Sequence, residues 1–347
     1  SEMQLLPFQR FRALAPLRLS SVVPRRNYRL PGPDAGVALR HVTKFTDFSR
    51  EEATSILDLA DRMKENPENY RLALEGRTLL MLFEKPSLRT RVSFETGMFQ
   101  LGGQAIAYNG ADSPLGYKET VEDFARVVSR YNDVVSARVK IRETINTLAQ
   151  YSTIPVINAL DDFAHPCQML ADMQTIREKF GGFEGLKLVF VGDTQNNMTY
   201  DLMRAATVLG FKFEASGPDH PDFGMEKSVV DECRALGGDV TVSHDACQAV
   251  KDADIIYADS WMSYTIPAEL RAVRFQLLMP FQVTQKLLSA AKPSTKFMNC
   301  LPAMRGEEQT SEVVDGPSSI VFDQAENRLH AQKALLAWLL RGPQFDK

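Results

Sequence analysis

The chain has 347 residues, of which 44% are hydrophobic and 24% are charged, and its formal net charge is −4. This length is enough for two domains of ordinary size, and the composition is that of a globular protein. The chain carries no basic stripe and no apolar run near the roughly 20 residues of a membrane span. We therefore expect no nucleic-acid partner and no membrane segment.

Residues 1–36 differ in composition from the rest of the chain. Six arginines face a single acidic residue, Glu2, before Asp34. Arginine-rich, acid-poor termini that contain serine are typical of organelle transit peptides, which predicts the mitochondrial matrix as the destination. The alternative is an N-terminal arm on a cytoplasmic protein. Whether this extension is cleaved stays open, and we leave it out of the catalytic argument.

Helical and strand patterns alternate from Ser49 onward. Ser49 and Glu52 form a capping box at the start of an amphipathic helix. A first series then follows, with strands at 78–83, 104–108, 133–138 and 155–158 and helices at 89–101, 119–130, 142–150 and 166–180.

A second series begins at the strand pattern Leu186–Asp193. Alternating strands and helices predict a parallel sheet in each half, with the boundary in the stretch Gly181–Gly185. Ligands of open parallel sheets bind outside the carboxyl ends of the strands. We therefore expect an α/β fold of two doubly wound parallel-sheet domains with an active-site cleft between them. The further elements of this series are helices at 197–209, 225–236, 246–251 and 323–340 and strands at 211–215, 239–243, 254–258 and 296–300.

The four cysteines are widely spaced, and none forms a C-x-x-C pair. This spacing argues against a zinc site and a disulfide framework, so we expect no metal and a reducing compartment. We expect no cofactor either. The strand start at Val189–Asp193 looks like a dinucleotide turn, but no G-x-G-x-x-G follows it, which disfavours a dehydrogenase.

The segment Ser87–Arg91, which reads S-L-R-T-R, stands between the strand at 78–83 and a helix. Free N–H groups and the helix dipole favour an anion at such a helix start. Hydroxyl and guanidinium groups suit phosphate oxygens, so the segment predicts a phosphate pocket. The alternative, which is favoured if the motif is taken alone, is a basic turn paired with Glu84 and Glu95.

Further polar clusters follow other strands. These are Arg138, His165–Gln168, Asn299–Pro302 and Glu326–Arg328. Together with S-L-R-T-R they resemble the motifs S-x-R-T-R, strand-end Arg, H-P-x-Q, C-L-P and E-N-R with which the carbamoyltransferases bind carbamoyl phosphate. The resemblance runs in one order from about His41 to Leu340, and it is greatest to the ornithine-specific members.

The resemblance implies a carbamoyl phosphate-binding domain at 37–180, on which the helix at 323–340 packs back, and an ornithine-binding domain at 181–322. The implied reaction carbamoylates the δ-amine of ornithine and gives citrulline and phosphate, in arginine biosynthesis or the urea cycle. A homotrimer is also implied, with the loop at 113–118 near a neighbour's active site. The alternatives are a carbamoyltransferase for another amine, such as putrescine, and a catalytically silent relative.

The resemblance also assigns roles to single residues. Arg138 would stabilise the oxyanion, and His165 would donate to the carbamoyl oxygen. Gln168 would accept from the carbamoyl NH2, and Leu88 would act through its backbone N–H. The full implied carbamoyl phosphate set is Ser87, Leu88, Arg89, Thr90, Arg138, His165, Gln168, Cys300, Leu301 and Arg328.

For several of these residues a purely structural interpretation stays open. Arg138 is alternatively a surface salt bridge, and Cys300 is alternatively a buried core residue. Arg328 is alternatively a helix-surface ion pair with Glu326 or Asp323.

The acceptor half is less fully matched. Asp259 would pair with the α-ammonium of ornithine, while Asn197 and Ser263 would hold its head group and chain. Cys300, together with Asp259, would lie near the attacking amine, so the implied catalytic set is Arg138, His165, Asp259 and Cys300. Tyr264 belongs to the same expected site, although Tyr264-Thr265 replaces the usual Met-Gly. Asn299 replaces a histidine before C-L-P, and Pro114 replaces a hydrogen-bonding residue in the loop that reaches the neighbouring subunit.

Overall fold

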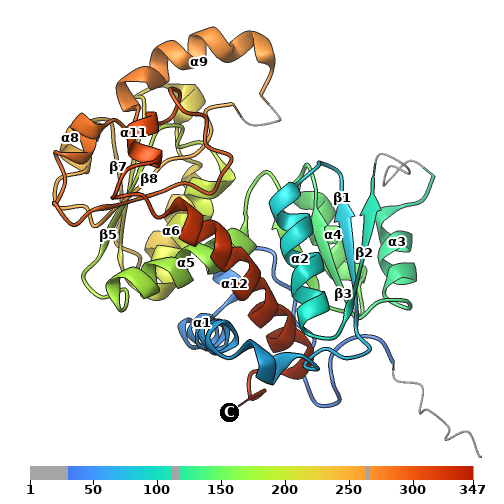
Figure 1. The fold of residues 1–347 in the computed structure, drawn as a ribbon. Helices are drawn as coiled ribbons and strands as arrows, with labels where there is room; N and C mark the ends of the chain where they lie inside the picture. The colour runs from blue at the N-terminus through green and yellow to red at the C-terminus, as the bar shows by residue number, and fades with distance from the viewer. Residues whose placement is uncertain (1–29, 111–117, 263–265, 347) are drawn as a thin grey trace, which may run out of the picture. The chain divides into compact units, whose positions relative to one another are not determined.

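The computed structural model describes residues 30–110, 118–262 and 266–346. These residues form two parallel β-sheets with helices packed around them (Figure 1). From Pro31 onward the chain forms one unit by its contacts. The first sheet has the order β2-β1-β3-β4 and the second the order β7-β6-β5-β8-β9. The strands are β1 (Thr78–Phe83), β2 (Gln104–Asn109), β3 (Val134–Arg138), β4 (Val156–Leu160), β5 (Lys187–Val191), β6 (Lys212–Ser216), β7 (Val240–Ser243), β8 (Ile255–Tyr257) and β9 (Lys296–Met298).

Helices connect the parallel strands, as parallel pairing requires. The α-helices are α1 (Arg50–Glu65), α2 (Leu88–Gln100), α3 (Val121–Val128), α4 (Arg142–Tyr151), α5 (Pro166–Phe180), α6 (Asn197–Leu209), α7 (Lys227–Ala235), α8 (Ala246–Ala249), α9 (Arg271–Leu278), α10 (Gln285–Leu288), α11 (Ser311–Val314) and α12 (Val321–Arg341). Short 3-10 turns lie at Phe45–Asp47, Pro67–Tyr70, Pro221–Phe223, Ala268–Leu270 and Met279–Phe281. Among the described residues no helix is long and apolar enough to cross a membrane.

Strands β1, β3 and β4 of the first sheet are buried on both faces, and β1 is accordingly a nearly continuous apolar run, whereas the edge strand β2 is partly exposed. Side chains alternate between the two faces of a strand. Leu79 and Met81 of β1 pack in the main core with α1, α2, α5 and α12. Leu80 and Leu82 point the other way and pack with α3 and α4.

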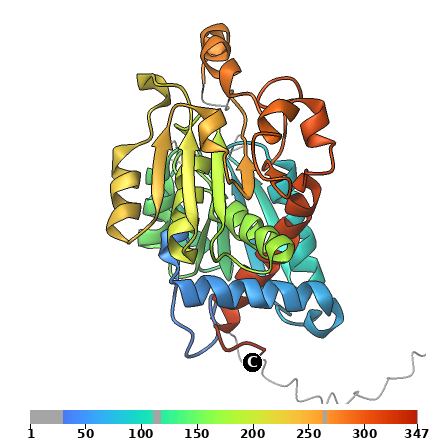
Figure 2. The same cartoon turned by 90° about the vertical axis from the view of Figure 1, so that its left-hand side faces the viewer.

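The second sheet follows the same rule, and Figure 2 shows its strands side by side. Leu188 and Phe190 of β5 join the main core with α6 and α7. Val189 and Val191 face a second core formed with α8, α10 and α11. One continuous cluster of buried residues therefore includes strands of both sheets.

Helices α1 and α5 join the two halves by contacting α6, and α12 does so by contacting β9. α12 packs against α5, α1 and α2, and α5 packs against α6 (Figure 1). On α6, the buried carboxylate of Asp201 accepts from the backbone N–H of Phe45 at 3.1 Å and from that of His165 at 3.0 Å. The start of α5 is thus fixed by a side chain of the second half.

The predicted fold class is confirmed, and the predicted helices and strands differ from those observed mostly by one or two residues. The capping box at Ser49 and the left-handed Gly181 after α5 are both present. The predicted strand at 296–300 is wrong at its end, because β9 stops at Met298. Asn299 leaves the ladder, and its backbone N–H instead donates to the Gln324 side chain at 3.1 Å.

Candidate active site

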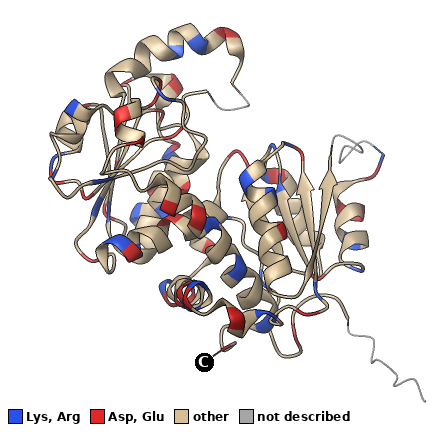
Figure 3. Cartoon of the chain, in the orientation of Figure 1, with Lys and Arg blue, Asp and Glu red and all other residues tan. Residues whose placement is uncertain are grey.

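The N-terminus of α2 follows β1 directly, as the S-L-R-T-R pattern predicts. Ser87 caps the helix, with its hydroxyl accepting from the backbone N–H of Thr90 at 3.4 Å. The side chain of Leu88 is 74% exposed, so this residue can contribute to the site only through its backbone N–H. Arg89 is half-buried and Thr90 is buried. Basic residues gather at this end of α2 in Figure 3.

The two arginines of the motif have different surroundings. Arg91 is largely exposed and pairs with Glu95 at 3.0 Å, as the structural alternative predicts for one of them. Within the described residues Arg89 forms no ion pair. The carboxylate of Glu84 instead accepts from the backbone N–H of Lys140 at 2.8 Å. Arg89 is therefore the guanidinium of this motif that is left for an anion.

Arg328 of α12 reaches across to the same place. Its side chain is buried, and its Nη1 donates to Oε1 of Gln168 at 2.8 Å while its Nη2 donates to Oγ1 of Thr90 at 3.3 Å. The alternative considered for Arg328, a surface ion pair with Glu326 or Asp323, is wrong, because Asp323 pairs with Lys179 and Glu326 lies 3.5 Å from Lys64. Residues from α2, α5 and α12 thus meet at one point.

His165 lies in the field of three arginines. Its ring is almost fully buried, and its Nδ1 has no hydrogen-bond partner within the described residues. Burial lowers the pKa of His165 well below its ordinary value, and the positive charges of Arg328, Arg138 and Arg89 lower it further. The imidazole is therefore neutral, and it can donate one N–H to a substrate oxygen.

Arg138 ends β3 and is buried rather than surface-exposed. Its pairing as a surface salt bridge, the alternative considered for it, does not fit this burial. The charge of Arg138 also lowers the pKa of the neighbouring Lys85, where burial is the larger cause. A concentration of positive charge at the strand ends is the arrangement that a phosphate dianion needs.

Cys300 and Asp259 form the polar pair of the second half. The thiol of Cys300 donates to Oδ1 of Asp259 at 3.2 Å. Burial raises the pKa of Cys300 well above its ordinary value, and the carboxylate of Asp259 adds to the shift. Burial also raises the pKa of Asp259. Cys300 is half-buried at the edge of the main core, so it stays a protonated donor with access to the site.

Asn299, which replaces a histidine of the usual motif, holds the turn that follows β9. It is fully buried, and its Oδ1 accepts from the backbone N–H of Leu301 at 2.7 Å while its Nδ2 donates to Gln309 at 3.0 Å. Leu301 has a φ of +57°, a left-handed conformation that is costly for a branched residue. The Asn299 side chain is therefore occupied in stabilising this conformation.

The remaining predicted acceptor residues are only partly visible. Asn197 begins α6, where its Nδ2 donates to the backbone oxygen of Asp161 at 2.7 Å. Ser263, Tyr264 and Pro114 lie outside the described residues. The structure therefore groups Thr90, Gln168 and Arg328 with His165, and the charge of Arg89 also acts on Cys300, which pairs with Asp259.

Other charged residues lie near the predicted ones, and of these Asp172 and Arg274 were not singled out from the sequence. Asp193 forms an ion pair with Arg274 of α9, and both side chains are mostly buried. Asp172 of α5 accepts from Gln168 and from Gln324. The spacing in the sequence could have indicated these contacts. Asp172 lies four residues after Gln168, and Gln324 lies four residues before Arg328, so each pair shares one face of a helix.

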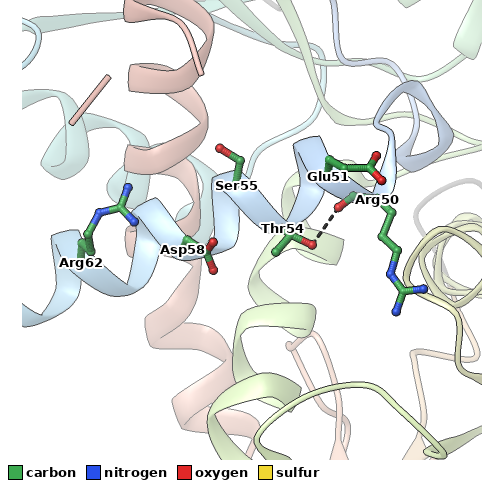
Figure 4. Close-up of a pocket in the computed structure, with 6 residues that line it drawn as sticks. All are labelled: Arg50, Glu51, Thr54, Ser55, Asp58 and Arg62. Carbon is green, nitrogen blue, oxygen red and sulfur yellow. Dashed lines mark hydrogen bonds between the residues drawn. The ribbon is translucent and has the colours of Figure 1, made fainter. Parts of the chain in front are cut away.

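The outer face of α1 carries a separate depression of about 400 Å³ (Figure 4). It contains none of the predicted site residues. Its polar side chains face solvent, and the Thr54 hydroxyl donates to the backbone oxygen of Arg50 at 2.8 Å. It is lined by Arg50, Glu51, Thr54, Ser55, Asp58 and Arg62.

Comparisons with known proteins agree with this geometry. Residues 40–178 match the family described as aspartate/ornithine carbamoyltransferase, carbamoyl-P binding domain, and residues 184–339 match its Asp/Orn binding domain. An ornithine carbamoyltransferase from Thermococcus kodakarensis is 49% identical over 311 residues, which is 88% of this chain and 98% of that protein. The chain belongs to the aspartate/ornithine carbamoyltransferase family.

Solved structures of the family extend the match to the fold. The ornithine carbamoyltransferase from Pyrococcus furiosus is 46% identical with a TM-score of 0.82, and the match covers 87% of this chain and 97% of that one. The ornithine transcarbamoylase from Giardia lamblia is 42% identical with a TM-score of 0.80, covering 86% and 97%. The carbamoyl-P domain match includes α2, Arg138 and His165, and the Asp/Orn match includes Asn197 and Asp259.

Proposed function

We propose that this family member is an ornithine carbamoyltransferase, which transfers the carbamoyl group of carbamoyl phosphate to the δ-amine of ornithine. The products are citrulline and phosphate. The observation that carries the proposal is the meeting of Thr90, Gln168 and Arg328 beside a neutral His165. A relative from Pyrococcus furiosus at 47% identity is described as anabolic, which supports a place in arginine biosynthesis.

At the phosphate end, the proposed ligands are the start of α2 and two arginines. The hydroxyls of Ser87 and Thr90, the backbone N–H of Leu88 and the guanidinium of Arg89 would hold the phosphate oxygens. Arg328 would add charge from α12. The burial of Thr90 and Arg328 supports this assignment, because a desolvated phosphate contact is stronger than an exposed one.

At the carbamoyl group, Arg138 and His165 would act on the oxygen and Gln168 on the NH2. The δ-amine attacks the carbamoyl carbon, the C–N bond forms, and negative charge develops on the carbamoyl oxygen. The charge of Arg138 and the N–H of neutral His165 would stabilise this oxyanion. The C–O bond to the phosphate then breaks, the phosphate leaves with the electron pair, and the proton lost by the amine nitrogen passes to the departing phosphate.

On the acceptor side, Asp259 would pair with the α-ammonium of ornithine, and Asn197 would bind its head group. Cys300 and Leu301 would close the site near the reacting carbon. The pair of Cys300 and Asp259, 3.2 Å apart, supports a polar anchor at this position. Ser263 and Tyr264 keep their proposed roles in ornithine binding, and both lie outside the described residues.

We also propose the domain division expected from the sequence, with 37–180 binding carbamoyl phosphate and 181–322 binding ornithine. The packing of α12 on α1, α2 and α5 supports the assignment of 323–340 to the first domain. The proposed matrix localisation rests on the arginine-rich residues 1–36 alone. The archaeal relatives quoted above give it no support.

A homotrimer is the proposed assembly, as the family resemblance implies. Large apolar side chains are exposed on α2 and on the neighbouring edge strand β2. Leu88 is 74% exposed, Phe99 81% and Ile106 51%. Exposed apolar side chains on neighbouring elements are typical of an interface, which supports assembly through this side of the first sheet.

The reaction itself is tested by product analysis. The purified protein is incubated with carbamoyl phosphate, with and without ornithine, and citrulline and phosphate are measured together. We expect equal amounts of the two products above the spontaneous breakdown of carbamoyl phosphate, and only when ornithine is present. Phosphate release without citrulline would refute the proposal.

A further inference from the structure

A buried carboxylate next to the carbamoyl phosphate residues has no role in the reaction described above. Asp172 lies two turns into α5 and is fully buried. Its Oδ1 accepts from Nε2 of Gln168 at 2.8 Å and from Nε2 of Gln324 at 2.7 Å. Its Oδ2 accepts from the hydroxyl of Tyr257 at 3.0 Å. Three donors from three elements therefore converge on one carboxylate.

The charges on either side of Gln168 allow only one orientation of its amide. An ionised carboxylate is purely an acceptor, so the NH2 of Gln168 must face Asp172. A guanidinium is purely a donor, so the oxygen of Gln168 must face Arg328, which donates to it at 2.8 Å. A flipped amide would place its NH2 against Arg328 and its oxygen against Asp172.

This orientation decides what Gln168 can recognise. An amide oxygen has two lone pairs, and Arg328 uses one of them. The second lone pair can accept a hydrogen from a substrate NH2. With the amide reversed, Gln168 would present donors and would repel that NH2.

We propose that Asp172 is a positioning residue that fixes Gln168 as an acceptor for the amino group of carbamoyl phosphate, and thereby selects carbamoyl over acyl phosphates. The inference rests on the proposed function, because it concerns the same site. Asp172 acts through Gln168 and does not touch the substrate.

The same carboxylate orients a second amide toward the acceptor half. The NH2 of Gln324 faces Asp172, so its oxygen is free to accept from the backbone N–H of Asn299 at 3.1 Å. Asn299 directly precedes Cys300 in the chain. Asp172 therefore lies where α5, α12 and β8 meet, and it links the amide that reads the substrate to the start of the C-L-P motif.

The test compares the binding of two ligands to the wild type and to Asp172→Asn. Acetyl phosphate keeps the phosphate and the carbonyl group of carbamoyl phosphate, but it has a methyl group in place of the NH2. Both dissociation constants are measured by calorimetry at about pH 8, where the carboxyl of Asp172, with a pKa of about 7, is ionised. Ornithine is absent, so a failure to transfer to ornithine would be a separate result.

We expect Asp172→Asn to weaken carbamoyl phosphate about tenfold, the effect of one lost hydrogen bond, and to change acetyl phosphate by less than about twofold. A purely structural role would weaken both ligands equally. Equal weakening, or no change for either ligand, overturns the proposal.

Two further variants make the test decisive. Tyr257→Phe removes one donor to Asp172 but leaves the carboxylate, so the preference for carbamoyl phosphate should persist, and its loss would overturn the proposal. Gln168→Leu removes the amide itself and serves if Asp172→Asn does not fold. The ratio of the two dissociation constants should then fall toward one, and a retained preference overturns the proposal.

Discussion

Arg89 and Arg91 are two positions apart on one helix, and the difference in their burial separates function from surface chemistry. The exposed Arg91 already has a partner in Glu95. Arg89 is half-buried beside Thr90, and its charge contributes to the lowered pKa of His165. The helical turn thus directs one arginine toward the site and the next toward solvent.

Arg89→Ala should abolish the carbamoyl phosphate binding that calorimetry detects. The variant loses a charge-assisted contact to phosphate, and it breaks no ion pair among the described residues, so the fold should be retained. Arg91→Ala is the matched control, and we expect it to keep the affinity and to change the free energy of unfolding by no more than about 0.5 kcal/mol. Unchanged affinity in Arg89→Ala would remove the central role of this helix start.

His165 should stay neutral through the working pH range of the enzyme. Burial and three arginines lower its pKa, so its NMR signals, assigned with His165→Gln, should show no titration midpoint near about pH 6.5, where an ordinary histidine titrates. Unfolding lets the ring take up a proton near its ordinary pKa of about 6.5. The contribution of His165 to the free energy of unfolding is therefore lost as the pH falls below about 6.5. A titration midpoint near 6.5 in the folded protein would contradict this account.

At the scale of single elements, α9 is fixed to the acceptor half by one buried arginine. Arg274 pairs with Asp193 after β5, and its Nε donates to the backbone oxygen of Trp261 at 3.1 Å. The ring of Trp261 packs edge-on against Phe275 of the same helix, with centroids 5.2 Å apart. These contacts anchor α9 to segments that lead into Asn197 and Asp259.

Arg274→Ala should raise the KM for ornithine about tenfold and leave the KM for carbamoyl phosphate unchanged. The variant leaves the buried carboxylate of Asp193 without its charge partner, and removing Arg274 raises the pKa of Asp193 above its present value of about 6. Arg271→Ala, one turn earlier and half-exposed, is the control and should change neither constant. Both KM values are measured by steady-state kinetics. An equal change in the KM for ornithine and for carbamoyl phosphate would contradict a role of Arg274 confined to the acceptor half.

The regular elements could be predicted because their signals are local. Apolar runs such as Thr78–Phe83 are buried on both faces, and Ser49 and Gly181 mark helix ends by their own chemistry. The short helices α9, α10 and α11 were missed, although α3 and α8, which have eight and four residues, were predicted from the alternation of strands and helices.

At the scale of the whole molecule, the site depends on contacts between residues far apart in sequence. Motif resemblance placed Arg328 near the phosphate, but its bonds to Thr90 and Gln168 join positions 238 and 160 residues away. Nothing local indicates that Asp172 meets Tyr257, or that Arg274 meets Asp193. These pairs of residues meet only because the elements that carry them pack together in the fold. Local sequence patterns do not indicate which distant residues will be in contact.

The assembly is tested by light scattering at micromolar protein concentration. We expect a mass three times that of the chain, because the exposed apolar side chains of α2 and β2 are otherwise left in water. Phe99→Glu places a charge on this surface, and it should lower the mass without unfolding the chain. A monomer with full activity would contradict the proposed trimer.

The most direct test of the account is the choice of acceptor, measured as kcat/KM for ornithine and for putrescine at saturating carbamoyl phosphate. Asp259 would pair with the α-ammonium of ornithine, which putrescine keeps as its second amine. Asn197 would bind the head group of ornithine, whose α-carboxylate putrescine lacks. A site built to hydrogen-bond such groups rejects an analogue without them by about 10⁴-fold. We predict that ornithine is preferred by this order, and equal or better turnover of putrescine would contradict the assignment.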